Sequence, residues 1–277
     1  MVFWIGIGSW ATLALTAPVR MIFPDLSLSD PSSEPLGFFL LAQTGFFVLL
    51  LGIYLTVRHL LGSSLTSFIT SASSVRISLA LRAGGIWFLI ICLFSAALHL
   101  IIPQQVQVTF KAPDFLLFLP FVLLLTPIQC LSEELLFRSY LWKWTEGHRI
   151  LSSPWVLCPL SGVLFLAAHL GNPEISALGG RLSIYGYYLL YGAFLMHLTL
   201  ADRGIEAAAG IHTANNLFAL LVLNYEGSVL PSPSVLTVQE LHSASSLAAV
   251  AAAAVLYLLL RHRLPGKALT GMISKER

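Results

Sequence analysis

The stretch TPIQCLSEELLFRSYLWKW, residues 126–144, places two adjacent carboxylates, Glu133 and Glu134, in one of the most apolar parts of the chain. A charged side chain at the centre of a membrane helix costs roughly 2.5–3.5 kcal/mol on insertion scales. Ionisable residues in such a position therefore indicate a functional site, provided that the segment around them is a membrane span. The composition of the whole chain shows whether that condition is met.

The composition is that of a membrane protein. Of the 277 residues, 57% are hydrophobic and 10% are charged, and the mean hydropathy is +0.83. Soluble domains carry about 25% charged residues. The formal net charge of +2 is too small to indicate a nucleic-acid partner. We therefore expect an all-α fold, a polytopic bundle of helices in the lipid bilayer.

Eight segments are predicted to cross the membrane, because a helix of about 20 apolar residues spans a bilayer core. They are residues 2–19, 37–57, 83–102, 115–141, 154–170, 183–201, 203–224 and 245–261. The first segment has no basic residues before it and a poor cleavage site after it. We therefore expect it to be a retained span and not a signal peptide.

The basic residues predict the orientation of these spans, since Lys and Arg are enriched in cytoplasmic loops. With a cytoplasmic N-terminus, twelve of the fifteen basic residues fall in cytoplasmic segments, and the others are Arg20, Lys111 and Arg181. Eight spans then place both termini in the cytoplasm, whereas a miscount of one span would break this parity. Among the cytoplasmic residues, Arg203 is expected to pair with Glu206.

The span at 115–141 carries Glu133, Glu134 and Arg138. Adjacent side chains on a helix point about 100° apart, so we expect the two carboxylates to face different points. Glu134 and Arg138 are four residues apart with the acid first, the favoured order for an ion pair. Glu133 is then left without an ionic partner among apolar side chains, an environment in which a carboxylate suits general acid or base catalysis. The alternative is a helix that leaves the membrane with charges at its end.

Two other spans carry ionisable side chains at a compatible depth. At 1.5 Å per residue, Glu133 and His169 lie about 17 and 22 Å from the turn between their helices. His212 lies about 14 Å from the start of its helix near Arg203. Asn216 follows His212 by one turn, and two donors on one stripe suit a developing oxyanion. The alternatives are packed histidines and an asparagine that bonds a neighbouring helix.

Three motifs in this order resemble those of a known family. EELLFR (133–138), FLAAH (165–169) and HTANN (212–216) match the EExxxR, FxxxH and HxxxN motifs of the CPBP or Abi family of intramembrane proteases, which includes the type II CAAX prenyl endopeptidases. The matching region covers about residues 115–220. The resemblance implies three parts: N-terminal helices at 1–114, a catalytic core at 115–224, and a loop, last helix and basic tail at 225–277.

The resemblance also implies an activity, the hydrolysis of a peptide bond in a membrane-associated or prenylated, CAAX-type substrate. By this analogy Glu133, helped by His169, activates a water molecule. His212 and Asn216 stabilise the tetrahedral oxyanion.

The remaining motif residues, Glu134 and Arg138, are expected to hold the site together and to lie within reach of the substrate. The use of a metal stays open. Glu133, His169 and His212 are the ligand types of a catalytic zinc site, but the chain has no HExxH motif. We expect a metal-free glutamic mechanism that requires no cofactor.

Two other functions remain open. Buried Glu and His residues also serve as proton relays, which allows a proton-coupled carrier. Many carriers have inverted repeats with broken helices, and the sequence shows no internal repeat. The second alternative is a catalytically silent immunity or scaffold protein of the same family. The sequence does not identify the substrate, the organism or the oligomeric state.

Overall fold

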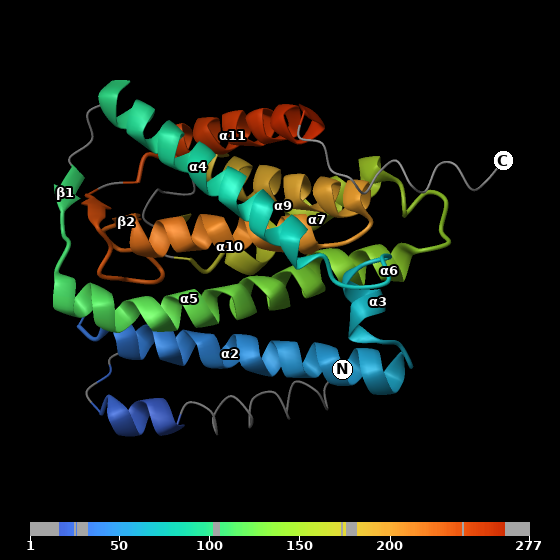
Figure 1. The fold of residues 1–277 in the computed structure, drawn as a ribbon, viewed down its shortest axis with the longest axis horizontal. Coiled ribbons are helices and arrows are strands. Elements are labelled where there is room, and N and C mark those ends of the chain that lie inside the picture. Colours follow the sequence, from blue (N-terminus) through green and yellow to red (C-terminus); the bar gives the residue numbers. More distant parts are fainter. Residues whose placement is uncertain are drawn as a thin grey trace.

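The protein folds into the all-α membrane bundle that the sequence predicts (Figure 1). The computed structural model describes residues 17–24, 26, 33–101, 106–172, 174–175, 182–239 and 241–263. Within these ranges, five helices are long and apolar enough to cross a membrane: Pro35–Leu60, Ile77–Leu100, Ala112–Thr145, Leu182–Asp202 and Ser243–Arg261. The predicted first span, residues 2–19, lies almost entirely outside the described residues.

The helices follow the predicted segments closely. They are α2 (Pro35–Leu55) with the π-helical turn η1 (Thr56–Leu60), α3 (Leu65–Ile69), α4 (Ile77–Ile101), α5 (Ala112–Glu134) with the π-helical turn η2 (Leu135–Tyr140) and α6 (Leu141–Thr145), α7 (Pro154–His169), α9 (Leu182–Asp202), α10 (Glu206–Leu221) and α11 (Ser243–Arg263). With 16 residues each, α7 and α10 are shorter than the usual span of about 20 residues, so the structure does not establish a count of eight spans.

The longest helical segment runs from α5 through η2 to α6. Pro120 and Pro127 lie inside α5, where each removes one backbone hydrogen bond. The π-helical turn η2 follows directly and contains Arg138. Single π turns inside helices occur frequently at functional sites.

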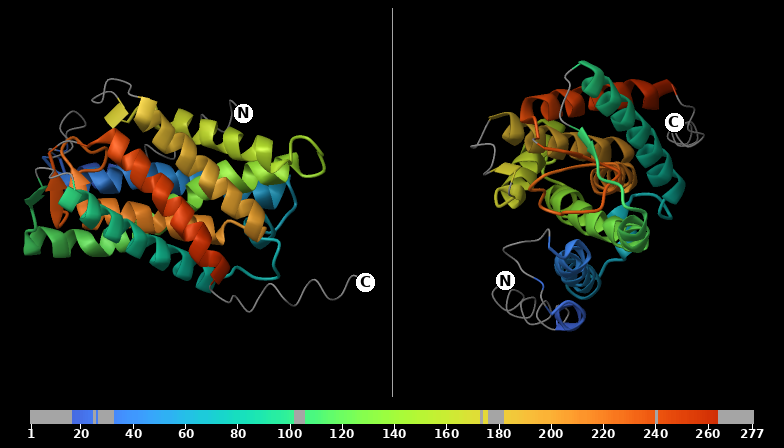
Figure 2. Two further views of the ribbon diagram at one scale, coloured as in Figure 1. Left: turned by 90° about the horizontal axis from the view of Figure 1, so that it is seen from above. Right: turned by 90° about the vertical axis from the view of Figure 1, so that its left-hand side faces the viewer.

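At the centre of the bundle lies α10, which contacts α4, α5 and α9 (Figure 2, right). Its close approach to α4 depends on glycine. A Cβ atom added to Gly210 would lie 2.0 Å from the carbonyl oxygen of Ala80, and one added to Gly84 would lie 2.6 Å from the carbonyl oxygen of Gly210. Small residues thus let the two backbones touch, as they do in many membrane helix pairs.

A small sheet, which the sequence analysis did not predict, lies at one end of the bundle (Figure 1). Its strands are β1 (Val106–Val108), β2 (Leu223–Tyr225) and β3 (Leu236–Val238), in the order β1-β3-β2. β3 pairs antiparallel with β1 and parallel with β2. Because β1 precedes α5 and β2 follows α10, the sheet ties together the loop ends of these two helices. We call this the sheet end.

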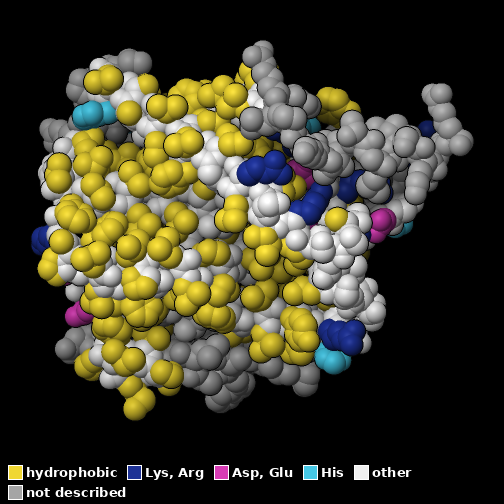
Figure 3. All heavy atoms as spheres, viewed as in Figure 1, with side chains coloured by type: hydrophobic (Ala, Val, Ile, Leu, Met, Phe, Trp, Pro, Cys, Tyr) yellow, Lys and Arg dark blue, Asp and Glu magenta, His cyan; other side chains and the backbone are white. Residues whose placement is uncertain are grey.

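The opposite end, at Arg76, Arg203 and Arg261, is the basic end. Most of the Lys and Arg side chains visible in Figure 3 lie in its right half, whereas apolar side chains cover most of the described surface in this view. Arg76 forms a two-pronged ion pair with Glu206, through Nε at 2.9 Å and Nη2 at 2.8 Å. This hydrogen-bonded carboxylate raises the pKa of Arg76 above its usual value. The predicted pair between Arg203 and Glu206 is therefore wrong.

A substitution at the glycine contact tests the packing of α10 on α4. Gly210→Ala forces a methyl group against the backbone at Ala80, and we expect overpacking to cost about 1–3 kcal/mol of stability. Thermal unfolding of the purified protein in detergent measures it. Gly85→Ala is the matched control, because a Cβ at Gly85 meets nothing within 4 Å. Equal melting temperatures for the two variants would contradict this account of the contact.

Candidate active site

A buried ion pair between Glu134 of α5 and Arg138 of η2 lies beneath the site. Arg138 Nη1 lies 3.0 Å from Glu134 Oε1, and both side chains are 0% exposed, which confirms the pair predicted from their spacing. The guanidinium carbon lies 4.7 Å from the ring centroid of Phe165, a cation–π distance. The guanidinium makes no hydrogen bond to a described residue. Among the described residues, Glu134 is therefore the one that compensates the positive charge of Arg138.

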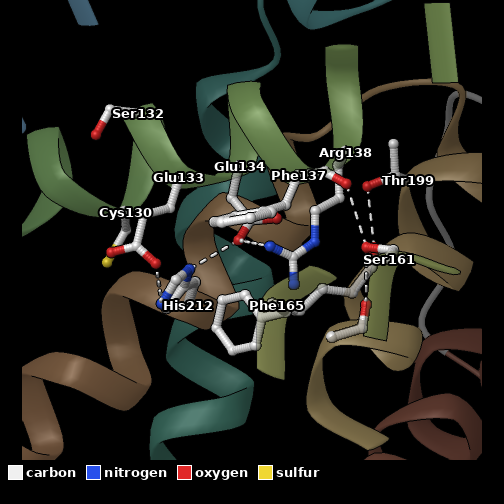
Figure 4. A network of polar contacts seen from close by, with 12 residues as sticks. Cys130, Ser132, Glu133, Glu134, Phe137, Arg138, Ser161, Phe165, Thr199 and His212 are labelled. Carbon is white, nitrogen blue, oxygen red and sulfur yellow. Dashed lines mark hydrogen bonds and ion pairs between the residues drawn. The ribbon is translucent and has the colours of Figure 1, made fainter. Parts of the chain in front are cut away.

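His212 of α10 connects the two glutamates (Figure 4). Its Nδ1 lies 2.7 Å from Glu134 Oε1, and its Nε2 lies 4.0 Å from Glu133 Oε2. The two carboxylates face different points, as their spacing predicts, and one imidazole reaches both because it carries a nitrogen on each side of its ring. The two glutamates diverge and still meet one residue.

A chain of glutamines holds the other oxygen of Glu133. Gln129, one turn earlier on α5, donates from Nε2 to Glu133 Oε1 at 3.3 Å. Gln43 of α2 donates to Gln129 Oε1 at 3.1 Å, and both glutamines are buried. The helix α2 therefore supports the site, although the sequence analysis placed it outside the catalytic core.

His169, the last residue of α7, is fixed on two sides. Its Nδ1 lies 2.7 Å from the carbonyl oxygen of Phe165, and its ring stacks on Tyr188 with 4.7 Å between centroids. Because a carbonyl oxygen only accepts, Nδ1 carries the proton and Nε2 is left as an acceptor. In the described structure His169 makes no direct hydrogen bond to Glu133.

Asn216 lies one turn after His212 on α10, as its spacing implies. Its Nδ2 donates to Cys130 Sγ of α5 at 3.5 Å. A thiol is a weak acceptor, so this bond leaves the amide available to a stronger partner.

These elements surround a cavity of about 350 Å³. Of the predicted site residues, four line it: Glu133, His169, His212 and Asn216. Glu134 and Arg138 do not line it, and both are fully buried. The cavity extends toward the sheet end, where Tyr225, Ser228 and His242 line it.

The cavity also contains Glu174, which the sequence analysis did not identify. It lies in a short helical segment between α7 and α9 and is buried, with 5% of its surface exposed. The sequence offered no signal for it, since GNPEISALGG, residues 171–180, has the composition of an ordinary loop. For Gln129, by contrast, the spacing of four residues before Glu133 was a usable signal.

The zinc ligand set that the sequence left open does not fit this arrangement. Among the described residues, no three His, Cys, Asp or Glu side chains are grouped closely enough to hold a metal ion. No step of the chemistry below is therefore assigned to a metal.

Comparison with known proteins gives two matches. Residues 114–218, which include all three motifs, match the family model described as type II CAAX prenyl endopeptidase Rce1-like. The chain is also 30% identical over 211 residues to the uncharacterized protein YyaK of Bacillus subtilis (strain 168), a match that covers 74% of this chain and 68% of that protein. No solved structure matches the chain significantly.

The buried pair and the cavity glutamate are predicted to differ in their effect on stability. Glu134→Gln leaves the buried charge of Arg138 uncompensated, and we expect a loss of about 3–5 kcal/mol. Glu133→Gln keeps an acceptor for Gln129, and we expect a loss of less than about 1 kcal/mol. Thermal unfolding in detergent compares the two variants. A Glu133→Gln variant as unstable as Glu134→Gln would contradict this division of roles.

Proposed function

The chain belongs to the Rce1-like family of type II CAAX prenyl endopeptidases, and from this we propose that it is an intramembrane endopeptidase. The observation that carries the proposal is the convergence of Glu133, His169, His212 and Asn216 on one cavity from three helices. A general base, an acceptor and two donors around one space are the groups that hydrolysis of a peptide bond needs.

In the proposed reaction, Glu133 is the general base. The gap of 4.0 Å between Glu133 Oε2 and His212 Nε2 is too long for a hydrogen bond, and a water molecule is the natural group to bridge such a distance. This water transfers one proton to Glu133 and keeps the other, which it donates as a hydrogen bond to Nε2 of His169. Its oxygen then attacks the carbonyl carbon of the scissile bond.

Charge balance supports the role of His212. Two carboxylates, Glu133 and Glu134, face one guanidinium, that of Arg138. A protonated His212 makes the cluster neutral, with Nδ1–H donating to Glu134 and Nε2–H directed toward the cavity. This N–H is then a donor for the oxyanion that forms when water attacks.

Asn216 supplies the second donor to the oxyanion from the same face of α10. As the tetrahedral intermediate collapses, Glu133 returns its proton to the leaving nitrogen and the carbon–nitrogen bond breaks. Removing one such donor typically costs about 10²–10³ in kcat. Glu134 and Arg138 act on the reaction only through His212 and Phe165, so they are positioning residues.

The proposed substrate is a membrane-associated or lipid-modified peptide. Apolar side chains, among them Trp87, Phe94 and Phe218, line much of the cavity and suit an apolar segment or a prenyl chain. We further propose that the basic end faces the cytoplasm, together with both termini. The sheet end, toward which the cavity extends, then lies on the other side of the membrane.

The orientation can be tested by reporter fusion in a bacterial host. With the C-terminus in the cytoplasm, a fluorescent protein fused after Arg277 fluoresces and alkaline phosphatase fused there is inactive. An active phosphatase fusion would contradict the proposed orientation and place the C-terminus outside the cytoplasm.

Activity is tested with the purified full chain and a panel of quenched peptides, farnesylated and plain. We expect cleavage by the wild type, and a loss of about 10²–10⁴ in kcat for Glu133→Gln and for His169→Ala, at little change in melting temperature. Glu146→Gln is the matched control, since its side chain is 63% exposed and pairs only with Lys143 at the basic end. A chelator is expected to leave the activity unchanged.

The alternatives predict other outcomes. A silent immunity or scaffold protein cleaves no peptide and keeps its cellular effect in Glu133→Gln. A proton-coupled carrier cleaves no peptide and loses transport in the same variant. Cleavage that survives Glu133→Gln would contradict the proposed general base.

A further inference from the structure

The cavity contains a second carboxylate, Glu174, whose partners satisfy only one of its two oxygens. Asn172 Nδ2 donates to Glu174 Oε1 at 2.9 Å, and the hydroxyl of Tyr188 donates to the same oxygen. Oε2 is buried and has no hydrogen-bond partner among the described residues. A buried carboxylate oxygen without a donor is costly, and it is a ready acceptor for a ligand.

Aromatic rings surround this carboxylate. Tyr188 stacks on His169, so Glu174 is one residue removed from the proposed catalytic histidine. The hydroxyl of Tyr225 of β2, at the sheet end, also interacts with the Glu174 carboxylate. Burial and the nearby negative charge of Glu174 raise the pKa of Tyr225 well above its ordinary value. A carboxylate among tyrosine rings is an environment that attracts cations.

In the proposed mechanism, Glu174 gives the cavity a net negative charge. Its acidic residues are Glu133 and Glu174, and no Lys or Arg is found among the described residues that line it. Arg138, the nearest basic residue of the motifs, is sealed beneath Phe165. Because a protonated His212 balances Glu133 in that mechanism, the carboxylate of Glu174 is the charge left to attract a cationic group.

We propose that Glu174, with Tyr188 and Tyr225, forms a subsite for a cationic group of the substrate, such as a Lys or Arg side chain or an N-terminal ammonium. The subsite rests on the proposed function, because it lies beside the residues assigned to catalysis. It identifies the preferred substrates as peptides that carry a cationic group near the scissile bond.

The test compares peptides that differ only in one residue, Lys against its uncharged isostere norleucine, placed in turn at each position around the scissile bond. At one position we expect the wild type to prefer Lys by about tenfold or more in kcat/KM, the range of a hydrogen bond to a charged group. Glu174→Gln removes the charge and keeps an acceptor for Tyr188 and Asn172, and we expect it to abolish the preference.

Glu226→Gln is the matched control, because Glu226 is an exposed carboxylate directly after Tyr225 and does not line the cavity. It should keep the preference for Lys. If Glu174 served only to position Tyr188 and His169, Glu174→Gln would lower kcat for both peptides equally, and that result would overturn the proposal. The absence of a preference at every position in the wild type would overturn it without any variant.

Binding separates this proposal from the proposed function. Fluorescence polarisation with labelled Lys and norleucine peptides is measured on Glu133→Gln and on Glu133→Gln/Glu174→Gln. Tighter binding of the Lys peptide, lost in the double variant, would uphold the subsite even if the wild type cleaved no peptide. Cleavage by the wild type with equal binding of both peptides would instead uphold the protease and reject the subsite.

Discussion

The site depends on one constraint, which is that a charge buried among membrane helices must have a partner. Arg138 is fully buried, and Glu134 is its one described ionic partner. The same carboxylate oxygen holds Nδ1 of His212, so the fourth and seventh predicted spans are joined by a single buried acid. Removing one partner lowers the stability of the fold by more than the pair itself contributes to it, because the other charge stays buried without a partner. The need to pair the charge of Arg138 through Glu134, which also holds His212, fixes η2 and α10 relative to each other.

Glu134 is occupied by its contacts with Arg138 and His212, so Glu133 is the glutamate that we propose as the general base. The adjacent glutamates share a helix and a histidine but differ in environment, since Glu134 is fully buried and Glu133 lines the cavity. The glutamine chain from α2 fixes the orientation of Glu133 without neutralising it. In the proposed mechanism this contrast separates the positioning acid from the catalytic acid. The second cavity carboxylate, Glu174, is proposed to select substrates by binding a cationic group.

Local patterns in the sequence predicted the helices and the Glu134–Arg138 pair, because both depend on residues close together in the chain. Contacts between distant residues outside the three motifs could not be predicted. Gln43 and Gln129 are 86 positions apart, and Arg76 and Glu206 are 130 positions apart, so their pairing follows from the packed bundle alone. The strands of three residues are too short to show an alternating pattern. Glu174 had no periodic context in the sequence, and its contacts with Asn172 and with Tyr188 of α9 appear only in the folded structure.

The most direct measurement is an experimental structure of the Glu133→Gln variant with an uncleaved peptide bound. The account predicts that the scissile carbonyl oxygen lies within hydrogen-bond distance of His212 Nε2 and Asn216 Nδ2. It also predicts an ordered water molecule between residue 133 and Nε2 of His169. A peptide bound outside the cavity, or a scissile carbonyl directed away from α10, would contradict the central claim that these helices assemble a peptide-hydrolysing site.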